Sequence, residues 1–494
     1  MNKDNFKYGT IKYINNIKVE LNFCLIGLEL KLIPIDWQQV MSMVLSNRII
    51  NEKFVWLKGN LISGETINIQ VYAPQFVNFI LPNSSKFINV HASIYAISEG
   101  TYDISTSFKC IEFSGGILDF VYPVSQIQRY DYKKLTVKIK NKRIKRFELK
   151  DNPNVEAIEY LIQPSVKMKT GEIVDFSESY SIVILELKNN ISIQDFLDYY
   201  INLTSMISFL CRQSNIRFAN IRAYNKRMIK NGYIDIYVHD NYENYIDEVA
   251  QVHKIINFNV LGNGIINLYK IMENKKNKPN LLFLPENNKE SNNIYYYSPI
   301  IITSSMEREY KLIANKFKED KNLKKQAKNI KEKFCDIIKS EKCDKRIKDK
   351  CNSLFNKLGD IEPSSKEMFG RLLDLLVKDL GSLKPKANKL YYSKFWLKID
   401  EEREKLIKIY GKFYRVRGSA AHDIIEWKDG VSNIYGFIEM IIYYFILRRI
   451  GVKVETRFII IENLFGPIIN ETYIQKEIKR KEYEKEGKRI LCEL

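Results

Sequence analysis

Short apolar runs separated by turn-forming residues fill most of the first 285 positions. Stretches such as IKVELNFCLI, FVWLKGNL and TINIQVYA are rich in Ile, Val, Tyr and Phe and have the length of β-strands. The same pattern predicts strands in FVNFIL, FINVHASIYAI, KLTVKIK, YSIVILEL, RFANIRAY and YIDIYVHD. Breakers such as SGET, PNSSK and SGG lie between the runs, where a sandwich or barrel must turn. The first half of the chain is therefore predicted to be β-rich.

One segment in this region has helical instead of strand periodicity: SIQDFLDYYINLTSMISFLC, residues 192–211. This inserted helix allows two subdomains, at about residues 1–180 and 181–285. The segment PENNKESNNIYYYSP that follows combines Asn, Ser and Pro with almost no aliphatic residues. We therefore predict a β-rich region over residues 1–285 and a linker over residues 286–303.

Beyond the linker the periodicity becomes helical. Residues 307–359 mix lysines, acids and spaced apolar residues, as amphipathic, solvent-exposed helices do. EPSSKEMFGRLLDLLVKDLG opens with a capping-like Pro-Ser-Ser, and Gly381 is a predicted stop. A long helix through Tyr414 and an apolar core helix after Gly430 follow. Residues 304–475 are predicted to form an all-α domain and residues 476–494 a charged helix or tail, so the fold class is α+β multidomain.

Charge and cysteine usage narrow the function classes. The 494 residues include 78 Lys and Arg against 59 Asp and Glu, a formal charge of +19 that favours polyanions such as RNA, although Lys-rich usage throughout is an alternative cause. The seven cysteines form no C-x-x-C pair, so we expect no metal and no cofactor. The run IYGFIEMIIYYFIL is too short to span ~30 Å of hydrocarbon. With a polar N-terminus that lacks an apolar signal region, the chain is expected to be cytoplasmic, with no membrane partner.

The stretch YRVRGSAAHD, which begins at residue 414, holds one of only four histidines. His422 lies five residues after Arg417 and seven after Arg415. A histidine near pKa 6.5 can exchange protons at neutral pH, and an arginine can hold two phosphate oxygens as negative charge develops. In a regular helix, residues five apart point ~140° from each other, whereas residues seven apart lie within ~20°. Arg417 would therefore share a site with His422 if the Gly-Ser step between them bends the chain, and Arg415 would if the helix is regular.

Other candidate sites are weaker. His239, Asp240 and His253 could sketch a metal or acid–base site, but no third ligand is evident. His91, in a predicted strand, is expected to be packed. Tyr295–Tyr297 could stack on bases or anchor one domain against another. No Walker A run or dinucleotide fingerprint is present, which disfavours an NTP-driven machine.

The helical half resembles the HEPN superfamily. FGRLLDLL, the amphipathic helix ending in YRVRGSAAHD and the apolar helix after it carry the resemblance, over roughly residues 300–475. HEPN ribonucleases have an Arg, then four to six residues, then His. More narrowly, a β-rich half containing YSIVILELKNNISIQDFLDYYINL before such a domain looks like the ApeA family of bacterial antiphage proteins.

Arg417 and His422 take the catalytic positions of the HEPN motif, so the resemblance implies these roles for them. Two neighbours depart from the usual pattern, because Gly418 stands where a polar residue is common and Asp423 where glycine is common. Ser419, the next residue, could supply the polar group that position 418 lacks. A supporting or phosphate-binding role is left for Arg415, Ser419 and Asp423.

The resemblance implies a metal-independent endoribonuclease of abortive infection, active as a homodimer through the C-terminal helical domain. His422 would transfer protons and Arg417 would stabilise the phosphorane, which leaves 2′,3′-cyclic phosphate and 5′-OH ends. The substrate would be tRNA or another cellular RNA, and a phage-derived trigger would act on the β-rich region as a sensor. The competing hypothesis is a non-catalytic HEPN scaffold that binds RNA or a partner protein.

Overall fold

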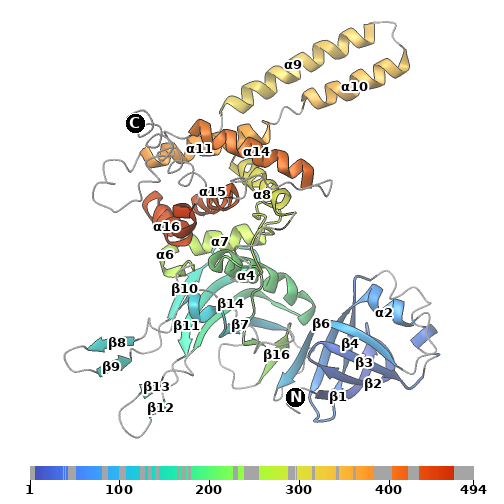
Figure 1. Ribbon diagram of the computed structural model, residues 1–494. Coiled ribbons are helices and arrows are strands. Elements are labelled where there is room, and N and C mark those ends of the chain that lie inside the picture. The colour runs from blue at the N-terminus through green and yellow to red at the C-terminus, as the bar shows by residue number, and fades with distance from the viewer. Residues whose placement is uncertain are drawn as a thin grey trace, which may run out of the picture. The chain divides into compact units, whose positions relative to one another are not determined.

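The computed structural model places a β-rich region before a helical region, so the chain is an α+β multidomain protein (Figure 1). It divides into two compact units, Met1–Lys270 with Glu286–Lys289 and Ile271–Pro285 with Glu290–Leu494. The structure describes residues 6–36, 38, 40–42, 52–80, 87–99, 107–122, 128–131, 136–139, 144–163, 167–168, 174–175, 180–225, 232–238, 255–286, 295, 297–313, 318–340, 344–359, 363–381, 403–420 and 433–471.

Six strands of the first unit close into a barrel. They pair antiparallel in the order β1-β2-β3-β6-β5-β4, and β4 returns to β1. Alternate residues of β2 and β3 are buried, as expected of strands with one face toward a barrel interior. The strands are β1 (Phe6–Ile14), β2 (Ile17–Ile26), β3 (Glu29–Pro34), β4 (Phe54–Leu61), β5 (Thr66–Tyr72) and β6 (Ile88–Glu99).

The barrel closes tightly where β1 meets β4. A Cβ atom on Gly9 would lie 2.1 Å from the carbonyl oxygen of Asn60, and one on Gly59 would lie 2.2 Å from that of Thr10. No side chain fits at these distances, so the close approach of the two strands requires glycine at both positions.

From β6 the sheet continues into six further antiparallel strands, in the order β16-β15-β7-β14-β11-β10. Helices cover one face of this part: Phe113 packs against Phe196, and Tyr160 stacks on Phe258 with 3.8 Å between ring centroids. Phe196 begins α4 and Phe258 begins α6. The strands are β7 (Phe108–Ser114), β10 (Ile144–Glu148), β11 (Val155–Gln163), β14 (Tyr180–Ile191), β15 (Asn220–Tyr224) and β16 (Tyr233–Tyr237).

Short helices and two small hairpins complete the β-rich region. The hairpins pair β8 with β9 and β12 with β13. The elements are α3 (Leu118–Val121), β8 (Gln128–Asp131), β9 (Thr136–Ile139), β12 (Lys167–Met168), β13 (Val174–Asp175), η3 (Ile193–Asp195), α4 (Phe196–Cys211), α6 (Phe258–Leu261) and α7 (Gly264–Glu273). The helix predicted over residues 192–211 is thereby confirmed as η3 followed by α4.

The strand predicted for FVNFIL is wrong, because residues 76–80 of this run belong to the helix α2 (Ala73–Ile80). Ala73, Phe76 and Val77 are buried, and their spacing of three and four residues is that of one helical face. Pro74 lies in the first turn, where a missing N–H costs no hydrogen bond. The helical period therefore begins at Ala73, before the apolar run, and a helix-start proline stands just ahead of that run.

The second unit is built from helices. The apolar helix α15 is buried along most of its length and packs with α8 and α16, which confirms the predicted core helix. No helix in the described part of the chain is both long and apolar enough to cross a membrane. The helices are α8 (Ser298–Ile313), α9 (Lys318–Ser340), α10 (Lys345–Gly359), α11 (Ser365–Gly381), α14 (Arg403–Ala420), α15 (Asn433–Arg449) and α16 (Val454–Glu471).

Both predicted ends of α11 are confirmed. The backbone N–H and Oγ of Ser364 donate to the Glu367 carboxylate at 2.7 and 2.9 Å, and the Glu367 N–H donates back to Ser364 Oγ at 3.3 Å. This reciprocal pair is a capping box, and the helix ends at Gly381. Upstream, α8 begins at Ser298, inside the segment 286–303 whose composition predicts a linker.

Candidate nucleic-acid site at the end of α14

The Arg–His motif lies at the C-terminal end of α14, whose rotation is fixed by its buried face. Leu406, Ile409, Tyr410 and Phe413 are buried at helical spacing, and the helix packs with α11 and α8. The ring of Tyr410 stacks on Phe369 of α11, with 4.2 Å between centroids and 7° between planes. These contacts determine which positions of the last turns face solvent.

Arg415 is exposed at the end of this helix. It follows buried Phe413 by two residues, about 200° around the helix, which carries it to the opposite side. It forms no hydrogen bond or ion pair with any described residue. Its guanidinium is therefore available to bind a phosphate group.

Other arginines of the helical unit are engaged with carboxylates between helices. The pair of Glu309 and Arg449 is the most buried, with side chains 1% and 10% exposed. Burial raises the pKa of Glu309 to about 7 against the opposing effect of Arg449. The pairs are Arg403 with Asp374 (3.0 Å for the longer of two hydrogen bonds), Arg449 with Glu309 (2.9 and 3.0 Å), Arg448 with Asp379 (3.3 Å) and Arg457 with Asp379 (3.0 Å).

Gly418 does not interrupt α14, which stays helical to Ala420. The backbones of Arg417 and Ser419 therefore lie in its last turn, while His422 and Asp423 lie outside the described residues. The bend that would bring Arg417 to the side of His422 is not present at Gly418.

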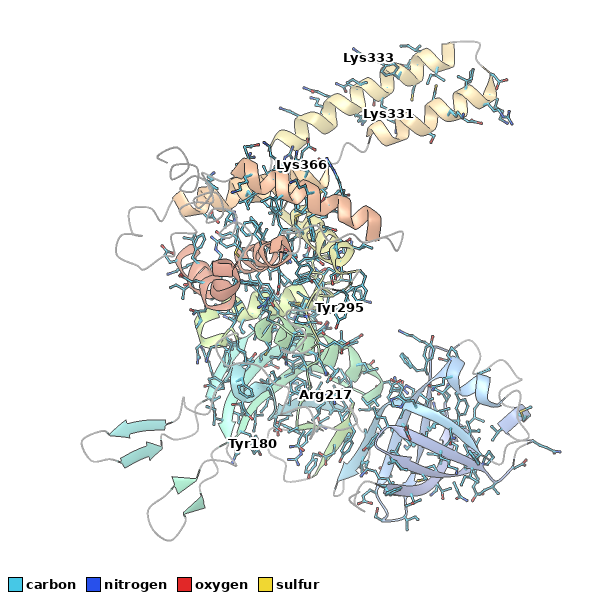
Figure 2. The ribbon with its side chains drawn as sticks, viewed as in Figure 1. Tyr180, Arg217, Tyr295, Lys331, Lys333 and Lys366 are labelled. Atoms are coloured by element: carbon cyan, nitrogen blue, oxygen red, sulfur yellow. The ribbon has the colours of Figure 1, made fainter. Side chains whose placement is uncertain are left out.

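Of the other candidate sites from the sequence, the structure describes two of the tyrosines but not the histidines and the aspartate of the candidate metal site. His239, Asp240 and His253 lie outside the described residues. Tyr295 and Tyr297 stack on each other, with ring centroids 5.4 Å apart, and are 40% and 41% exposed (Figure 2 labels Tyr295). Within the described residues, no three His, Cys, Asp or Glu side chains gather as metal ligands.

His91 is exposed, so the expectation that it is packed is wrong. It lies on β6 between buried Val90 and Ala92. Because successive residues of a strand point to opposite faces, the two neighbours take the inward positions and His91 points outward.

A lysine-rich helical hairpin lies between α8 and α11 in the chain. Its helices α9 and α10 pack side by side (Figure 1), and Figure 2 labels Lys331 and Lys333. Lys325, Lys328 and Lys333 are exposed, which confirms the amphipathic, solvent-exposed helices predicted there. The hairpin offers further positive charge for a polyanion.

Sequence reasoning missed a group of carboxylates on the first unit's sheet. Glu112 and Glu159 are buried there, at 9% and 4% exposure. The signal that could have found them is an acid inside an apolar strand pattern, as in FKCIEFS and VEAIEYLIQ. A buried carboxylate at such a position needs partners, which marks a polar site.

No family model, curated protein or solved structure matches the chain. The candidate site is therefore judged from its motif and geometry.

Proposed function

We propose that the chain is a metal-independent HEPN-type endoribonuclease of bacterial antiphage defence, active as a homodimer and controlled by its β-rich region. The observation that carries this proposal is the YRVRGSAAHD motif at the end of α14, in a helical unit. The exposure of Arg415, and its lack of a hydrogen bond or ion pair with any residue the structure describes, support it, because an arginine that binds phosphate must be free of structural carboxylates.

The chemistry needs only groups that the motif supplies. The ribose 2′-OH of the RNA attacks the adjacent phosphorus, and the bond to the leaving 5′ oxygen breaks. His422 exchanges protons with the attacking or the leaving oxygen, and an arginine stabilises the charge on the phosphorane. The products are a 2′,3′-cyclic phosphate and a 5′-OH.

The two arginines have different support. The HEPN resemblance assigns the transition-state role to Arg417, whereas the helical backbone through Gly418 favours Arg415 as the neighbour of position 422. The other arginine would then grip a flanking phosphate. Loss of the transition-state arginine lowers cleavage of bound RNA, and loss of the phosphate-gripping one lowers affinity and its salt dependence.

Single-turnover cleavage and RNA affinity, both measured in EDTA, test the proposal with Arg415→Ala, Arg417→Ala and His422→Ala. We expect His422→Ala and one arginine variant to cut at least ~100-fold more slowly, the size of a general acid–base contribution. Lys408→Ala, which removes an exposed charge from the same helix, is the control and should leave cleavage unchanged. Full activity in all three motif variants, or a need for added divalent ions in the cutting step, would contradict the proposal.

The second candidate is a non-catalytic scaffold that binds RNA or a partner protein. The net charge of +19 and the exposed lysines of the α9–α10 hairpin favour RNA binding whether or not cleavage occurs. Salt-dependent RNA binding by wild type without any 2′,3′-cyclic phosphate product would select this alternative.

A further inference from the structure

A cavity of about 290 Å³ lies on the sheet formed by β16, β15, β7, β14, β11 and β10. These strands belong to the first unit, whereas the Arg–His motif belongs to the second. Glu112 of β7 lines this cavity, and the next residue, Phe113, packs against Phe196 of α4. Because consecutive strand residues point to opposite faces, the cavity lies on the face opposite α4. Side chains from β10, β11, β14, β7 and β15 line it.

Two buried glutamates flank an isoleucine in one row across the cavity. In the strand register, Glu159 of β11 lies opposite Ile184 of β14, and Ile184 lies opposite Glu112 of β7. Two strand spacings therefore separate the glutamates, so their Cα atoms are roughly 10 Å apart. The row ends in an arginine on each side, Arg146 opposite Glu159 and Arg222 opposite Glu112.

The cavity floor is aliphatic at Ile184 and in the neighbouring row of the sheet, where Leu161 lies opposite Ile182. Leu161, Ile182 and Ile184 line it and are 5%, 5% and 6% exposed. Tyr224 adds an aromatic ring at one side, and its hydroxyl donates to Glu112 at 3.3 Å. Burial raises the pKa of Tyr224 and the charge of Glu112 raises it further, so the hydroxyl remains a donor.

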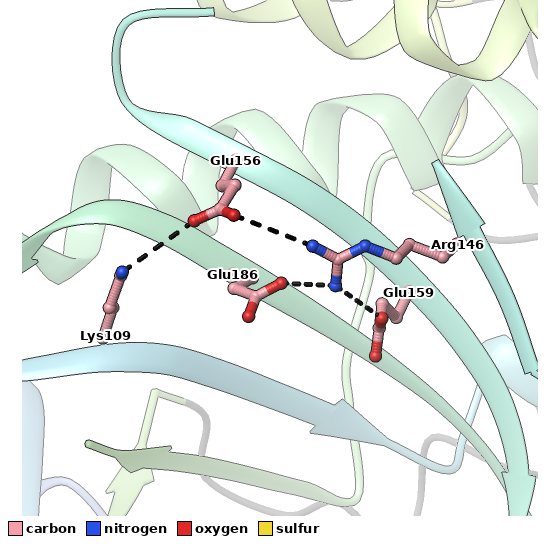
Figure 3. A network of polar contacts seen from close by, with 5 residues as sticks. All are labelled: Lys109, Arg146, Glu156, Glu159 and Glu186. Atoms are coloured by element: carbon pink, nitrogen blue, oxygen red, sulfur yellow. Dashed lines mark hydrogen bonds and ion pairs between the residues drawn. The ribbon is translucent and has the colours of Figure 1, made fainter. Parts of the chain in front are cut away.

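Among the described residues around the cavity, the side chains joined by ion pairs and hydrogen bonds include more carboxylates than cations. Arg146 donates to Glu159 at 2.7 Å and to Glu186 at 2.5 Å, and Glu156 lies 3.8 Å from both Arg146 and Lys109 (Figure 3). Arg222 donates to Asp235 at 3.1 Å. The described side chains that these contacts join are five carboxylates, Glu112, Glu156, Glu159, Glu186 and Asp235, and three cations, Lys109, Arg146 and Arg222. Within this group the negative charges exceed the positive charges by two.

We propose that this cavity binds an alkyl diamine or polyamine, with one ammonium group at Glu112 and another at Glu159. A four-carbon diamine places its nitrogens about 6 Å apart. With a hydrogen bond of ~2.8 Å at each end, its reach exceeds the roughly 10 Å between the Cα atoms of the two glutamates. Its methylene groups lie on Leu161, Ile182 and Ile184, and its two charges neutralise the excess. The proposal concerns the first unit alone and does not depend on RNA cleavage.

Other occupants fit less well. Glu112 and Glu159 lie on strands to either side of β14, with Ile184 between them. A single metal ion cannot bind both, because metal–oxygen bonds are only ~2.0–2.6 Å long. An anion would add to the excess negative charge. An amine with one charge would leave one of the two glutamates without a new partner.

Calorimetric titration of the full chain at pH 7 and about 0.15 M salt tests the proposal with four probes. These are 1,4-diaminobutane, spermidine, 1-butylamine and 1,4-butanediol. We expect the diamine and spermidine to bind about 10- to 100-fold more tightly than butylamine, because each supplies one more charge-assisted hydrogen bond. The diol, which has the same length and no charge, should give no measurable binding.

Variants locate the site. Glu112→Gln and Glu159→Gln should each reduce diamine affinity to the level of butylamine, whereas Glu148→Gln, an exposed change on β10 outside the cavity, should leave it unchanged. Ile184→Lys places an ammonium between the two glutamates and should block the diamine in a folded protein, which keeps the test decisive if a glutamine variant unfolds. Equal affinity for diamine and butylamine, unchanged affinity in Ile184→Lys, or no binding of any probe would overturn the proposal.

Discussion

Asp379 of α11 shows how a single carboxylate can connect three helices. It accepts a hydrogen bond from Tyr444 of α15 and pairs with Arg448 of α15 at 3.3 Å and Arg457 of α16 at 3.0 Å. The guanidinium of Arg457 also lies over the Tyr444 ring, 4.6 Å from its centroid. Two largely buried positive charges thus depend on one aspartate.

We expect Asp379→Asn to lower the free energy of unfolding by roughly 3–5 kcal/mol, because it leaves buried arginines without their counter-charge. Asp374→Asn, five residues earlier on the same helix, is the matched control. Its carboxylate is 52% exposed and pairs with Arg403, so the loss should stay below about 1 kcal/mol. Urea unfolding followed by helical circular dichroism measures both, and equal losses would show that burial does not set the strength of these pairs.

The two candidate sites differ in how far the sequence predicts them. Arg415, Arg417 and His422 lie within eight residues of one another, so the sequence alone identifies them as a candidate site. Helical geometry then gives the two alternatives for the arginine that lies beside His422. The row of Glu159, Ile184 and Glu112 depends on the register of three strands that are far apart in the chain. No local pattern contains that register, so the cavity could not be predicted.

At the scale of elements, the continuity of α14 bears most directly on function. Gly418 lies in the helix, and glycine in a helix costs about 0.5–1 kcal/mol relative to alanine. If the active form keeps this helix, Gly418→Ala should raise the free energy of unfolding by up to about 1 kcal/mol and preserve RNA cleavage.

Thermal unfolding and single-turnover cleavage measure these two effects on the same samples. Gly418→Pro is the opposing control, since proline inside a helix removes a hydrogen bond and clashes with the preceding turn. A folded Gly418→Ala protein that no longer cuts RNA would show that the chain must bend at this glycine, and would return the catalytic role to Arg417.

Strong periodicity predicted elements well, and mixed patterns did not. β2 and β4 have the predicted bounds because their apolar residues alternate or cluster between clear turns. β7 and β11 were missed because a glutamate interrupts each apolar run, and the site that needs those glutamates is tertiary. The run FVNFIL predicts a strand where α2 lies, because six residues are too few to separate the helical period from the strand period.

At the scale of the whole molecule, composition and period predicted the α+β class and the order of a β-rich half before a helical half. Composition and period do not predict which strands pair with one another. The barrel closes through β1 with β4 and β5 with β6, and β16 extends the sheet by pairing with β6. These pairings join strands tens to more than a hundred residues apart, so they follow from packing of the whole chain instead of local preference.

The last prediction concerns two copies of the chain. If the proposed cleft takes its arginine from one protomer and His422 from the other, two inactive variants can complement each other. An equimolar, exchanged mixture of His422→Ala with the inactive arginine variant contains mixed dimers as half of its dimers, and each mixed dimer has one complete pair. We therefore expect roughly a quarter of wild-type cleavage, from two proteins that do not cut alone.

Light scattering on the same samples establishes the dimer, and the His422→Ala protein mixed with a variant carrying both substitutions is the control. That mixture has no complete pair across the cleft, so it should stay inactive. Complementation would require the two copies to share one active site, because exchange restores no residue to either chain. A strict monomer at micromolar concentration with intact ribonuclease activity would contradict the shared cleft, since each chain would then hold a complete site of its own.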